Sequence, residues 1–216
     1  MVSIIKIIKK TLLKKTLFRI YFEENILSLS SFIKGRVLDI GSGSNPSYRN
    51  CLPVDIEYLK SEYITQEGID LVVDFNVPFE METGTVDTIL LFNNLYIAEK
   101  PEFTLNEIYR VLKVGGHALI SSPYATNEMP EPHDFLRFTS EGLSRLFSSS
   151  GFEVIEKRFM GDRFSVCAYA LHPFFVFSIV RALANILAVC FDMFIPRKIR
   201  NKHPLPMGYF YVIRKK

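Results

Sequence analysis

Cysteine is scarce in this 216-residue sequence, which contains only three. Cys51, Cys167 and Cys190 are odd in number and far apart, so they indicate neither a disulfide framework nor a zinc site. A reduced, cytoplasmic setting is therefore expected. The net charge is only +3, which makes nucleic acid an unexpected partner. The sequence also lacks internal repeats, low-complexity linkers and any obvious metal-ligand cluster.

A cleavable signal peptide is not indicated, because lysines interrupt each apolar run near the start and no small-residue cleavage site follows. Residues 1–34 are predicted to form a basic, helical leading segment. Its first twenty residues contain no acid and hold the basic residues Lys6, Lys9, Lys10, Lys14, Lys15 and Arg19. A helix from Val2 to Ile20 would place Ile4, Ile5, Ile8 and Leu12 on one face. Two interpretations stay open: a packed or frayed helix with solvated lysines, and a basic helix lying on an anionic membrane surface.

The remaining residues, 35–216, are predicted to form one α/β domain. Short apolar and β-branched runs typical of buried strands recur along it. These runs are Arg36–Ile40, Leu52–Ile56, Ile69–Phe75, Thr85–Phe92, His117–Ser121, Phe152–Phe159 and Tyr209–Ile213. Helices are predicted from Pro101 to the Gly115-Gly116 pair and from Thr139, a good N-cap, to Gly151. This alternation favours a mostly parallel sheet with helices on both faces.

An apolar insertion at about residues 164–200 does not fit a minimal α/β domain. Pro173 is expected to open a helix that stays apolar from Phe174 to Ile195. Its polar residues form a narrow stripe, consisting of Ser178, Arg181, Asn185 and Asp192. Three interpretations stay open: a membrane span, a helix embedded in the interfacial plane, and a helix packed on the sheet or on a partner. The basic cluster from Pro196 to Arg200 would suit anionic headgroups.

A third glycine is missing from the turn that follows the first predicted strand. Gly41 and Gly43 allow a tight turn and a close approach of a ligand to the main chain, but the next position of a dinucleotide motif is Pro46. No lysine follows at the spacing of a phosphate-binding loop. The pattern suits a cationic nucleoside without phosphates. Asp55 could accept both ribose hydroxyls, and Asp39 would add negative potential near the cation.

With these motifs in order, the sequence resembles the class I S-adenosylmethionine-dependent methyltransferases of the type 11 kind, including members associated with bacterial surface polysaccharide synthesis. The resemblance is carried by Val37–Pro46, Asp55, Val73–Phe75, Val86–Asn94, Glu107–Gly116, Phe138–Val154 and the P-x-D-F-x-R-F-T segment Pro132–Thr139. It implies a Rossmann-like sheet of seven mostly parallel strands, with the last strand antiparallel and the apolar helical insertion before it. The implied cofactor is S-adenosyl-L-methionine, with no metal.

The resemblance also implies roles for individual residues. Asp39, Gly41, Ser42 and Gly43 would line the methionine and ribose part of the cofactor, and Asp55 would bind the ribose hydroxyls. The adenine would lie against Asp74 and Phe75, and Asn93 would lie where the methyl group meets the acceptor. Catalytic candidates are His133 and Asp134 as bases and Arg137 as an orienting cation, each with a structural alternative. For Arg137 that alternative is a salt bridge to Asp134.

The chain departs from the family near the acceptor, with Tyr96-Ile97 and Met129 at positions where relatives carry polar residues. We expect O-methylation of a glycan or a lipid-linked saccharide intermediate by a cytoplasmic enzyme, peripheral on the inner membrane face. A small lipophilic acceptor, such as a quinone precursor, is the second expectation. The third is a catalytically degenerate, membrane-associated scaffold.

Overall fold

The computed structural model describes residues 3–130 and 133–216 of the chain. Val2 of the predicted leading helix and Pro132 of the P-x-D-F motif lie outside these ranges. Seven strands form one sheet: β1 (Arg36–Ile40), β2 (Glu57–Glu62), β3 (Leu71–Val72), β4 (Val86–Phe92), β5 (Leu112–Pro123), β6 (Phe152–Met160) and β7 (Gly208–Lys215). The helices are α1 (Ile4–Leu12), α2 (Leu17–Ser28), α3 (Pro101–Val111), α4 (Ser140–Ser149), α5 (Arg163–Ala170), α6 (Ser178–Phe194) and α7 (Arg197–Lys202). Short 3₁₀ turns are η1 (Ser30–Phe32), η2 (Arg49–Cys51), η3 (Leu95–Ile97) and η4 (His172–Phe174).

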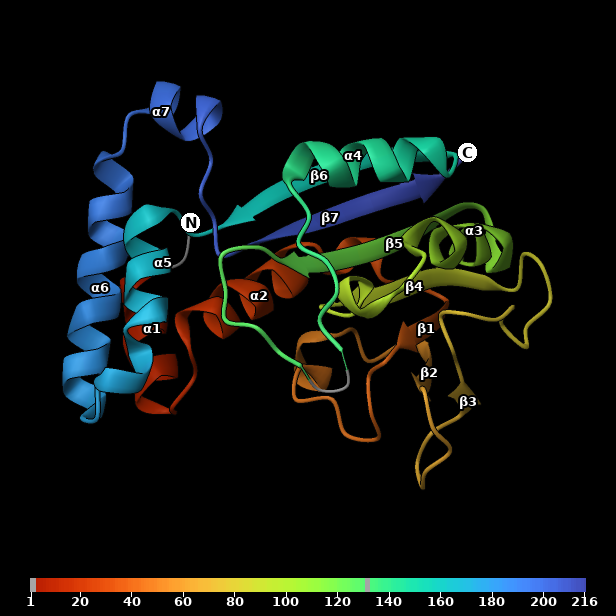
Figure 1. Ribbon diagram of the computed structural model, residues 1–216. Helices are drawn as coiled ribbons and strands as arrows, with labels where there is room; N and C mark the ends of the chain where they lie inside the picture. Colours follow the sequence, from red (N-terminus) through yellow and green to blue (C-terminus); the bar gives the residue numbers. More distant parts are fainter. Residues whose placement is uncertain (1–2, 131–132) are drawn as a thin grey trace.

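The strand order is β3-β2-β1-β4-β5-β7-β6 (Figure 1). Strands β1 to β5 pair in parallel, and β7 runs antiparallel between β5 and β6. The prediction of a mostly parallel, seven-stranded sheet with an antiparallel last strand is confirmed. Gly208 of β7 pairs with Pro123 of β5 and with Met160 of β6, so the carboxyl ends of β5 and β6 meet at one edge. In open α/β sheets this carboxyl edge is where ligands bind.

Helices cover both faces of the sheet because β1, β4, β5 and β7 bury side chains on each side. On one face, α3 and α4 pack Leu105, Ile108 and Leu143 against the sheet. On the other face, Phe22 and Ile26 of α2 do the same. Thr139 caps α4 as predicted, accepting a hydrogen bond from the Gly142 amide at 3.1 Å.

The leading segment is helical, but it forms two helices, α1 and α2, in place of the single helix considered for Val2 to Ile20. The chain turns at Lys14, which adopts a left-handed φ of 61°, and Thr16 then caps α2 through a 3.2 Å bond from the Arg19 amide. Several of the lysines expected to be solvated are instead paired. The buried Glu23 carboxylate forms salt bridges with Lys10, Lys15 and Arg19.

Three other predicted boundaries are corrected. The second strand is Glu57–Glu62 and not Leu52–Ile56, where Leu52 is buried beneath α2 but Val54 is exposed. Helix α3 ends at Val111, and β5 begins at Leu112 and passes through the Gly115-Gly116 pair. The insertion contains α5, η4, α6 and α7, and the apolar helix predicted from Phe174 to Ile195 is α6, which begins later, at Ser178.

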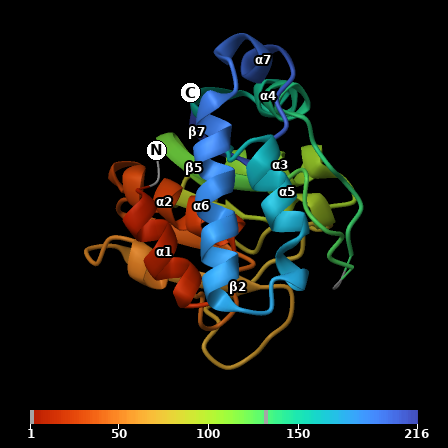
Figure 2. The same cartoon turned by 90° about the vertical axis from the view of Figure 1, so that its left-hand side faces the viewer.

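Helices α1, α5 and α6, together with η4, form what we call the helical layer. Figure 2 shows α1, α6 and α5 side by side across one face of the molecule, and Figure 1 shows them beyond one end of the sheet. A third apolar cluster holds this layer to α2, and its buried residues include Ile7, Ile20, Ala188 and Val189. Across residues 3–130 and 133–216, no helix has the length and apolar character that crossing a membrane requires.

Candidate functional site

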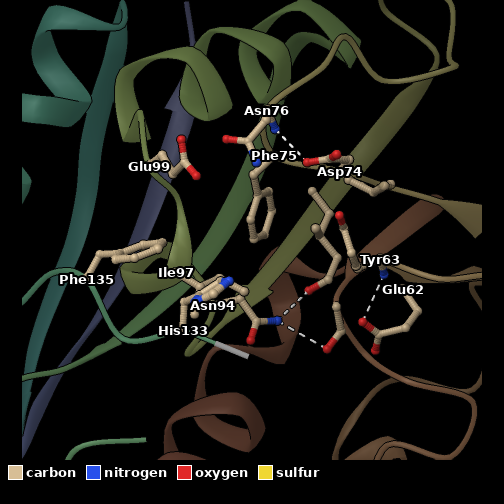
Figure 3. Close-up of a pocket in the computed structure, with 13 residues that line it drawn as sticks. Glu62, Tyr63, Asp74, Phe75, Asn76, Asn94, Ile97, Glu99, His133 and Phe135 are labelled. Carbon is tan, nitrogen blue, oxygen red and sulfur yellow. Dashed lines mark hydrogen bonds between the residues drawn. The ribbon is translucent and has the colours of Figure 1, made fainter. Parts of the chain in front are cut away.

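A cavity of about 380 Å³ opens at the carboxyl edge of the sheet. Its lining comes from the ends of β1 and β2, the segment after β3, the turn after β4 and the loop before α4. In Figure 3, Glu62 and Asp74 lie on one side of the cavity, and Glu99, His133 and Phe135 lie on the other. One end of the cavity thus carries two carboxylates, and the other carries one carboxylate and two aromatic rings, with Asn94 between them.

The floor of the cavity is built by Gly41 and Asn94. The Asn94 side-chain amide donates to the carbonyls of Ile40 and Gly41 at 3.0 and 3.1 Å (Figure 3). Gly41 has a φ of +69°, and a Cβ at this position would lie 2.2 Å from Asn94 Nδ2. A side chain here is thus excluded both by backbone conformation and by space, so Gly41 is required where the end of β1 meets Asn94.

Glu62 provides the carboxylate at the end of β2. One of its oxygens accepts a 2.9 Å hydrogen bond from the Tyr63 amide. The other oxygen lies near Gly43, 3.9 Å from the place that a Cβ on this glycine would occupy. Asp55 was predicted to lie at this strand end, and that placement is wrong. It is exposed in the turn before β2 and does not line the cavity. Glu62 was missed because the strand was predicted as Leu52–Ile56, which ends before the observed strand Glu57–Glu62 begins.

Asp74, Phe75 and Asn76 line the cavity beyond β3. Asp74 Oδ1 accepts a 2.8 Å hydrogen bond from the Asn76 amide, which closes a local turn. The Phe75 ring is half-buried against the core, and its carbonyl accepts a 3.4 Å bond from Thr104 of α3. Asp74 and Phe75 therefore lie in the cavity as predicted, and Asn76 joins them.

Asp39 does not line the cavity, contrary to the prediction. Its side chain points to the α2 face of the sheet and is fully buried, where it accepts hydrogen bonds from the hydroxyls of Tyr48 at 2.9 Å and Tyr58 at 2.5 Å. Burial raises the pKa of the Asp39 carboxyl to about 7, although both tyrosine bonds act to lower it. This carboxyl therefore braces β1 against β2 and the turn before η2.

Asp39 should make the protein less stable as the pH rises from about 4 to 7. The folded protein holds this proton more tightly than the unfolded chain, so the stabilising contribution is complete below the unfolded pKa and is lost as the pH passes the folded value. We expect Asp39→Asn to reduce the pH dependence of the unfolding free energy by about 1 kcal/mol per pH unit between pH 5 and 7. Urea unfolding at several pH values measures this, with Asp55→Asn as the exposed control. Equal slopes of unfolding free energy against pH for the wild type, Asp39→Asn and Asp55→Asn would contradict the raised pKa of the Asp39 carboxyl.

The far end of the cavity is formed by Ile97, Glu99, His133 and Phe135. The His133 imidazole stacks on the Phe135 ring, with centroids 4.9 Å apart and planes 16° apart. The amide of Phe135 also donates to the Tyr96 carbonyl at 3.2 Å, which ties the loop to η3. His133 is thus the one predicted catalytic residue that lines the cavity.

Asp134 and Arg137 pair with each other and do not line the cavity. Asp134 also accepts the Met129 amide at 2.8 Å, and the Arg137 guanidinium lies 5.3 Å from the centroid of the Tyr96 ring. The Arg137 side chain lowers the pKa of the Asp134 carboxyl. The alternative of a salt bridge between them is therefore the one observed, and the pair holds the loop that carries His133.

The remaining predicted residues lie beside the cavity rather than on its lining. Ser42 and Gly43 belong to the turn after Gly41, with the Ser42 amide donating to Ser61 at 3.0 Å. Asn93 has a left-handed φ of 55°, and its side-chain oxygen accepts from Ser121 at 3.1 Å. This turn presents Asn94, one residue later, to the cavity. The residues missed from sequence are Glu62, Tyr63, Asn76, Asn94, Glu99 and Phe135.

The described residues of the lining carry three carboxylates, Glu62, Asp74 and Glu99, and neither lysine nor arginine. A concave site with charge of one sign favours a ligand of the opposite sign. Among residues 3–130 and 133–216, no group of histidines, cysteines and acids is arranged to hold a metal ion. The cavity is suited to a cationic organic ligand.

Residues 38–120 match a family described as a methyltransferase domain. This stretch runs from β1 into β5 and contains Gly41, Glu62, Asp74 and Asn94 of the cavity. No curated protein matches the sequence.

Several solved structures have the same fold. The S-adenosylmethionine-dependent methyltransferase from Archaeoglobus fulgidus is 17% identical, with a TM-score of 0.57 over 89% of this chain and 94% of that chain. Phosphoethanolamine N-methyltransferase 2 of Haemonchus contortus, in complex with S-adenosyl-L-methionine, is also 17% identical, with a TM-score of 0.57 over 89% of this chain and 52% of that chain. The [4+2]-cyclase SpnF is 18% identical, with a TM-score of 0.58 over 91% and 82%. At these identities the likeness shows the fold alone. Residues 38–120 therefore match a methyltransferase domain, and the chain has the fold of solved S-adenosylmethionine-dependent methyltransferases.

Proposed function

We propose that this protein transfers the methyl group of S-adenosylmethionine to an oxygen of a small-molecule or lipid-linked acceptor. The observation that carries the proposal is the cavity at the carboxyl edge of the sheet, because its described lining is acidic and holds neither lysine nor arginine. S-adenosylmethionine carries a sulfonium cation and no phosphate. A nucleotide phosphate in the same place would meet carboxylates and find no basic side chain.

The cofactor would occupy the end of the cavity nearest β1, β2 and β3. Its methionine part would lie along the turn from Gly41 through Ser42 to Gly43, of which Gly41 lines the cavity. Glu62 would accept the ribose hydroxyls, because a carboxylate at this strand end can take two hydrogen bonds side by side. The adenine would rest on Phe75, with Asp74 and Asn76 as polar partners at its edge.

The acceptor would occupy the end that contains His133 and Phe135. In the reaction the S–CH₃ bond breaks as an O–CH₃ bond forms, and the sulfonium leaves as the neutral thioether of S-adenosylhomocysteine. A neutral His133 imidazole would take the proton of the acceptor hydroxyl. Alignment of donor and acceptor can supply about 7–11 kcal/mol of the barrier reduction in favourable cases. The Asp134–Arg137 pair would contribute by holding His133 in place.

For the acceptor we propose a glycan or a lipid-linked saccharide intermediate, on the strength of the sequence resemblance described above. A small lipophilic acceptor such as a quinone precursor is the second candidate, favoured by the apolar side chains of Ile97 and Phe135 at that end of the cavity. The third candidate, a catalytically inactive scaffold, is favoured by the engagement of Asp134 and Arg137 with each other.

Two measurements on the full chain test this function. Calorimetric titration with S-adenosylhomocysteine should give one site per chain, and an absence of binding by the folded protein would rule out both enzymatic proposals. Incubation with methyl-tritiated S-adenosylmethionine and either a lipid extract or an aqueous extract should then label one fraction. Label that survives mild base but appears as O-methyl sugar after acid hydrolysis supports the glycan acceptor. Cofactor binding without label in either fraction favours the scaffold.

A further inference from the structure

Helix α6 shows its apolar side to the outside of the molecule. Each of its exposed side chains is apolar: Ile179, Val180, Leu183, Leu187, Phe191, Met193 and Phe194. Ile179 is 77% exposed and Phe194 is 81% exposed. A helix on the surface of a globular domain ordinarily turns such a face toward the core and its polar face toward water. Helix α6 does the reverse.

The polar side chains of α6 face the protein and are used there. Buried Asn185 donates to the Thr11 hydroxyl of α1 at 3.1 Å. Buried Asp192 accepts the backbone amides of Asp162, Phe164 and Ser165 at 3.0, 2.9 and 3.2 Å, at the beginning of α5. These contacts fix the rotation of α6 about its axis, so the outward apolar face is built into the fold.

The apolar face continues onto both neighbours of α6. Helix α1 exposes Ile4, Ile5, Ile8 and Leu12. At the other side, Phe164 of α5 packs on Phe191 with ring centroids 5.3 Å apart. The turn from η4 into α6 exposes Phe174, Val176 and Phe177. Figure 2 shows these elements side by side on the face toward the viewer. Apolar exposure of this extent marks an interaction surface rather than scattered surface residues.

The segments that form this face carry exposed charges of one sign, although Glu24 of α2 pairs with Lys6 and Lys10 of α1. Residues 3–15 contain no acid, and residues 163–206 contain a single acid, the buried Asp192. Exposed cations lie at both ends of the layer: Lys9 and Lys14 on the α1 side, and Arg197, Lys198 and Lys202 in α7, which follows α6 directly. A protein partner would not require this one-sided charge. An apolar face rimmed by lysine and arginine complements an anionic phospholipid surface, where the cations meet headgroups and the apolar side chains enter the acyl boundary.

We propose that the helical layer docks on an anionic phospholipid membrane, with α1 and α6 parallel to the surface and their apolar side chains inserted into one leaflet. Helix α6 is about 25 Å long, so it would lie in the interface along its whole length. The absence of a spanning helix among the described residues agrees with this orientation. The proposal explains why the outward side of α6 is apolar although these side chains are exposed in the folded chain.

Docking in this orientation would bring the cavity to the membrane. The insertion leaves the sheet after Met160 and returns before Gly208, and these two residues pair at the carboxyl edge. The Gly41 turn and Asn94 lie at the same edge. An acceptor held in the leaflet by a lipid tail would thus lie on the side of the molecule toward which this edge of the sheet points. This consequence rests on the methyltransferase function proposed above, whereas the docking itself does not.

Vesicle binding tests the docking surface. We expect the full chain to float with vesicles of phosphatidylcholine containing 30% phosphatidylglycerol at low salt, and to bind pure phosphatidylcholine at least tenfold more weakly. The triple variant Ile179→Ser, Leu183→Ser, Phe194→Ser removes exposed apolar groups only, and should lower the partition coefficient at least tenfold. The matched control is Val54→Ser with Val114→Ser, which are exposed valines outside the layer. The control should bind as the wild type does.

Three results would overturn the proposal. One is a wild type that stays unbound at every salt concentration, and another is a triple variant that binds as well as the control. The third is a concentration-dependent dimer in sedimentation that the triple variant abolishes without vesicle binding by either protein, which would assign this face to a second copy of the chain. Titration of each protein with S-adenosylhomocysteine keeps the two proposals apart, because loss of docking with intact cofactor binding leaves the proposed function standing.

Discussion

Glu62→Ala is expected to bind S-adenosylhomocysteine about 100-fold more weakly than the wild type, whereas Asp55→Ala binds as the wild type does. The expected loss is about 3 kcal/mol, because two ribose hydroxyls would lose a charged acceptor. Glu62 lies in the cavity at the end of β2, while Asp55 is exposed before that strand begins. Calorimetric titration of both variants measures the difference.

Two further variants make this comparison sharper. Glu62→Gln keeps one acceptor oxygen and the length of the side chain, so its affinity should lie between those of the wild type and Glu62→Ala. Asp74→Ala removes the other carboxylate at the same end of the cavity and should reduce affinity without affecting the ribose contact. An equal loss of affinity for S-adenosylhomocysteine in Asp55→Ala and Glu62→Ala would mean that the cofactor does not bind at the carboxyl end of β2. An unchanged affinity in Glu62→Ala would remove this carboxylate from the site.

The error at Asp55 shows what the sequence could and could not determine about the site. Leu52–Ile56 has the apolar character of a strand. In the structure, however, Leu52 packs into the core beneath α2, and Val54 is exposed to solvent. The true strand, Glu57–Glu62, has neither a continuous apolar run nor a regular alternation, and it lies next to the edge strand of the sheet. Without a periodic apolar pattern this strand gives a weaker signal than the apolar run before it, and the resulting error of a few residues moved the expected carboxylate from Glu62 to Asp55.

Central strands were predictable because both of their faces are buried. Strands β1 and β4 match their predicted apolar runs to within a residue. The start of β5 was not predictable, because the Gly115-Gly116 pair resembles a helix stop. In the structure Gly115 has a φ of +77° within the strand, at the end of β5 away from the cavity. Glycine marks a special backbone conformation, but it does not say which element contains it.

The apolar insertion illustrates a different limit. The narrow polar stripe of α6 was visible in the sequence, and periodicity alone placed Asn185 and Asp192 on one side of the helix. Periodicity does not say which side faces inward. The usual assignment places polar residues in water, yet here Asn185 and Asp192 are the buried ones. Their partners, Thr11 and the amides at the start of α5, are distant in sequence and could be identified only from the fold.

Asp192→Ala should destabilise the helical layer by about 3 kcal/mol while leaving cofactor binding unchanged. The variant removes the acceptor of three backbone amides at the beginning of α5 and of the Ser165 hydroxyl, whose bond to Asp192 is 2.5 Å long. Buried donors left without partners cost their full desolvation free energy. For a chain of this size the melting temperature of the layer should fall by roughly 6–12 °C. Thermal unfolding and proteolysis within residues 163–202 would measure this.

The same variant tests whether the helical layer and the cavity on the sheet are stabilised independently. The core beneath the helical layer is a cluster of its own, and the cavity lies on the sheet, so S-adenosylhomocysteine should still bind to Asp192→Ala. Vesicle binding should weaken, because the apolar face of α6 is presented only while Asp192 and Asn185 hold its rotation. Asp192→Asn, which keeps one acceptor oxygen, should lose less stability than the alanine variant. Joint loss of cofactor binding and of layer stability would instead mean that the layer and the cavity fold as one unit, and that α6 supports the site directly.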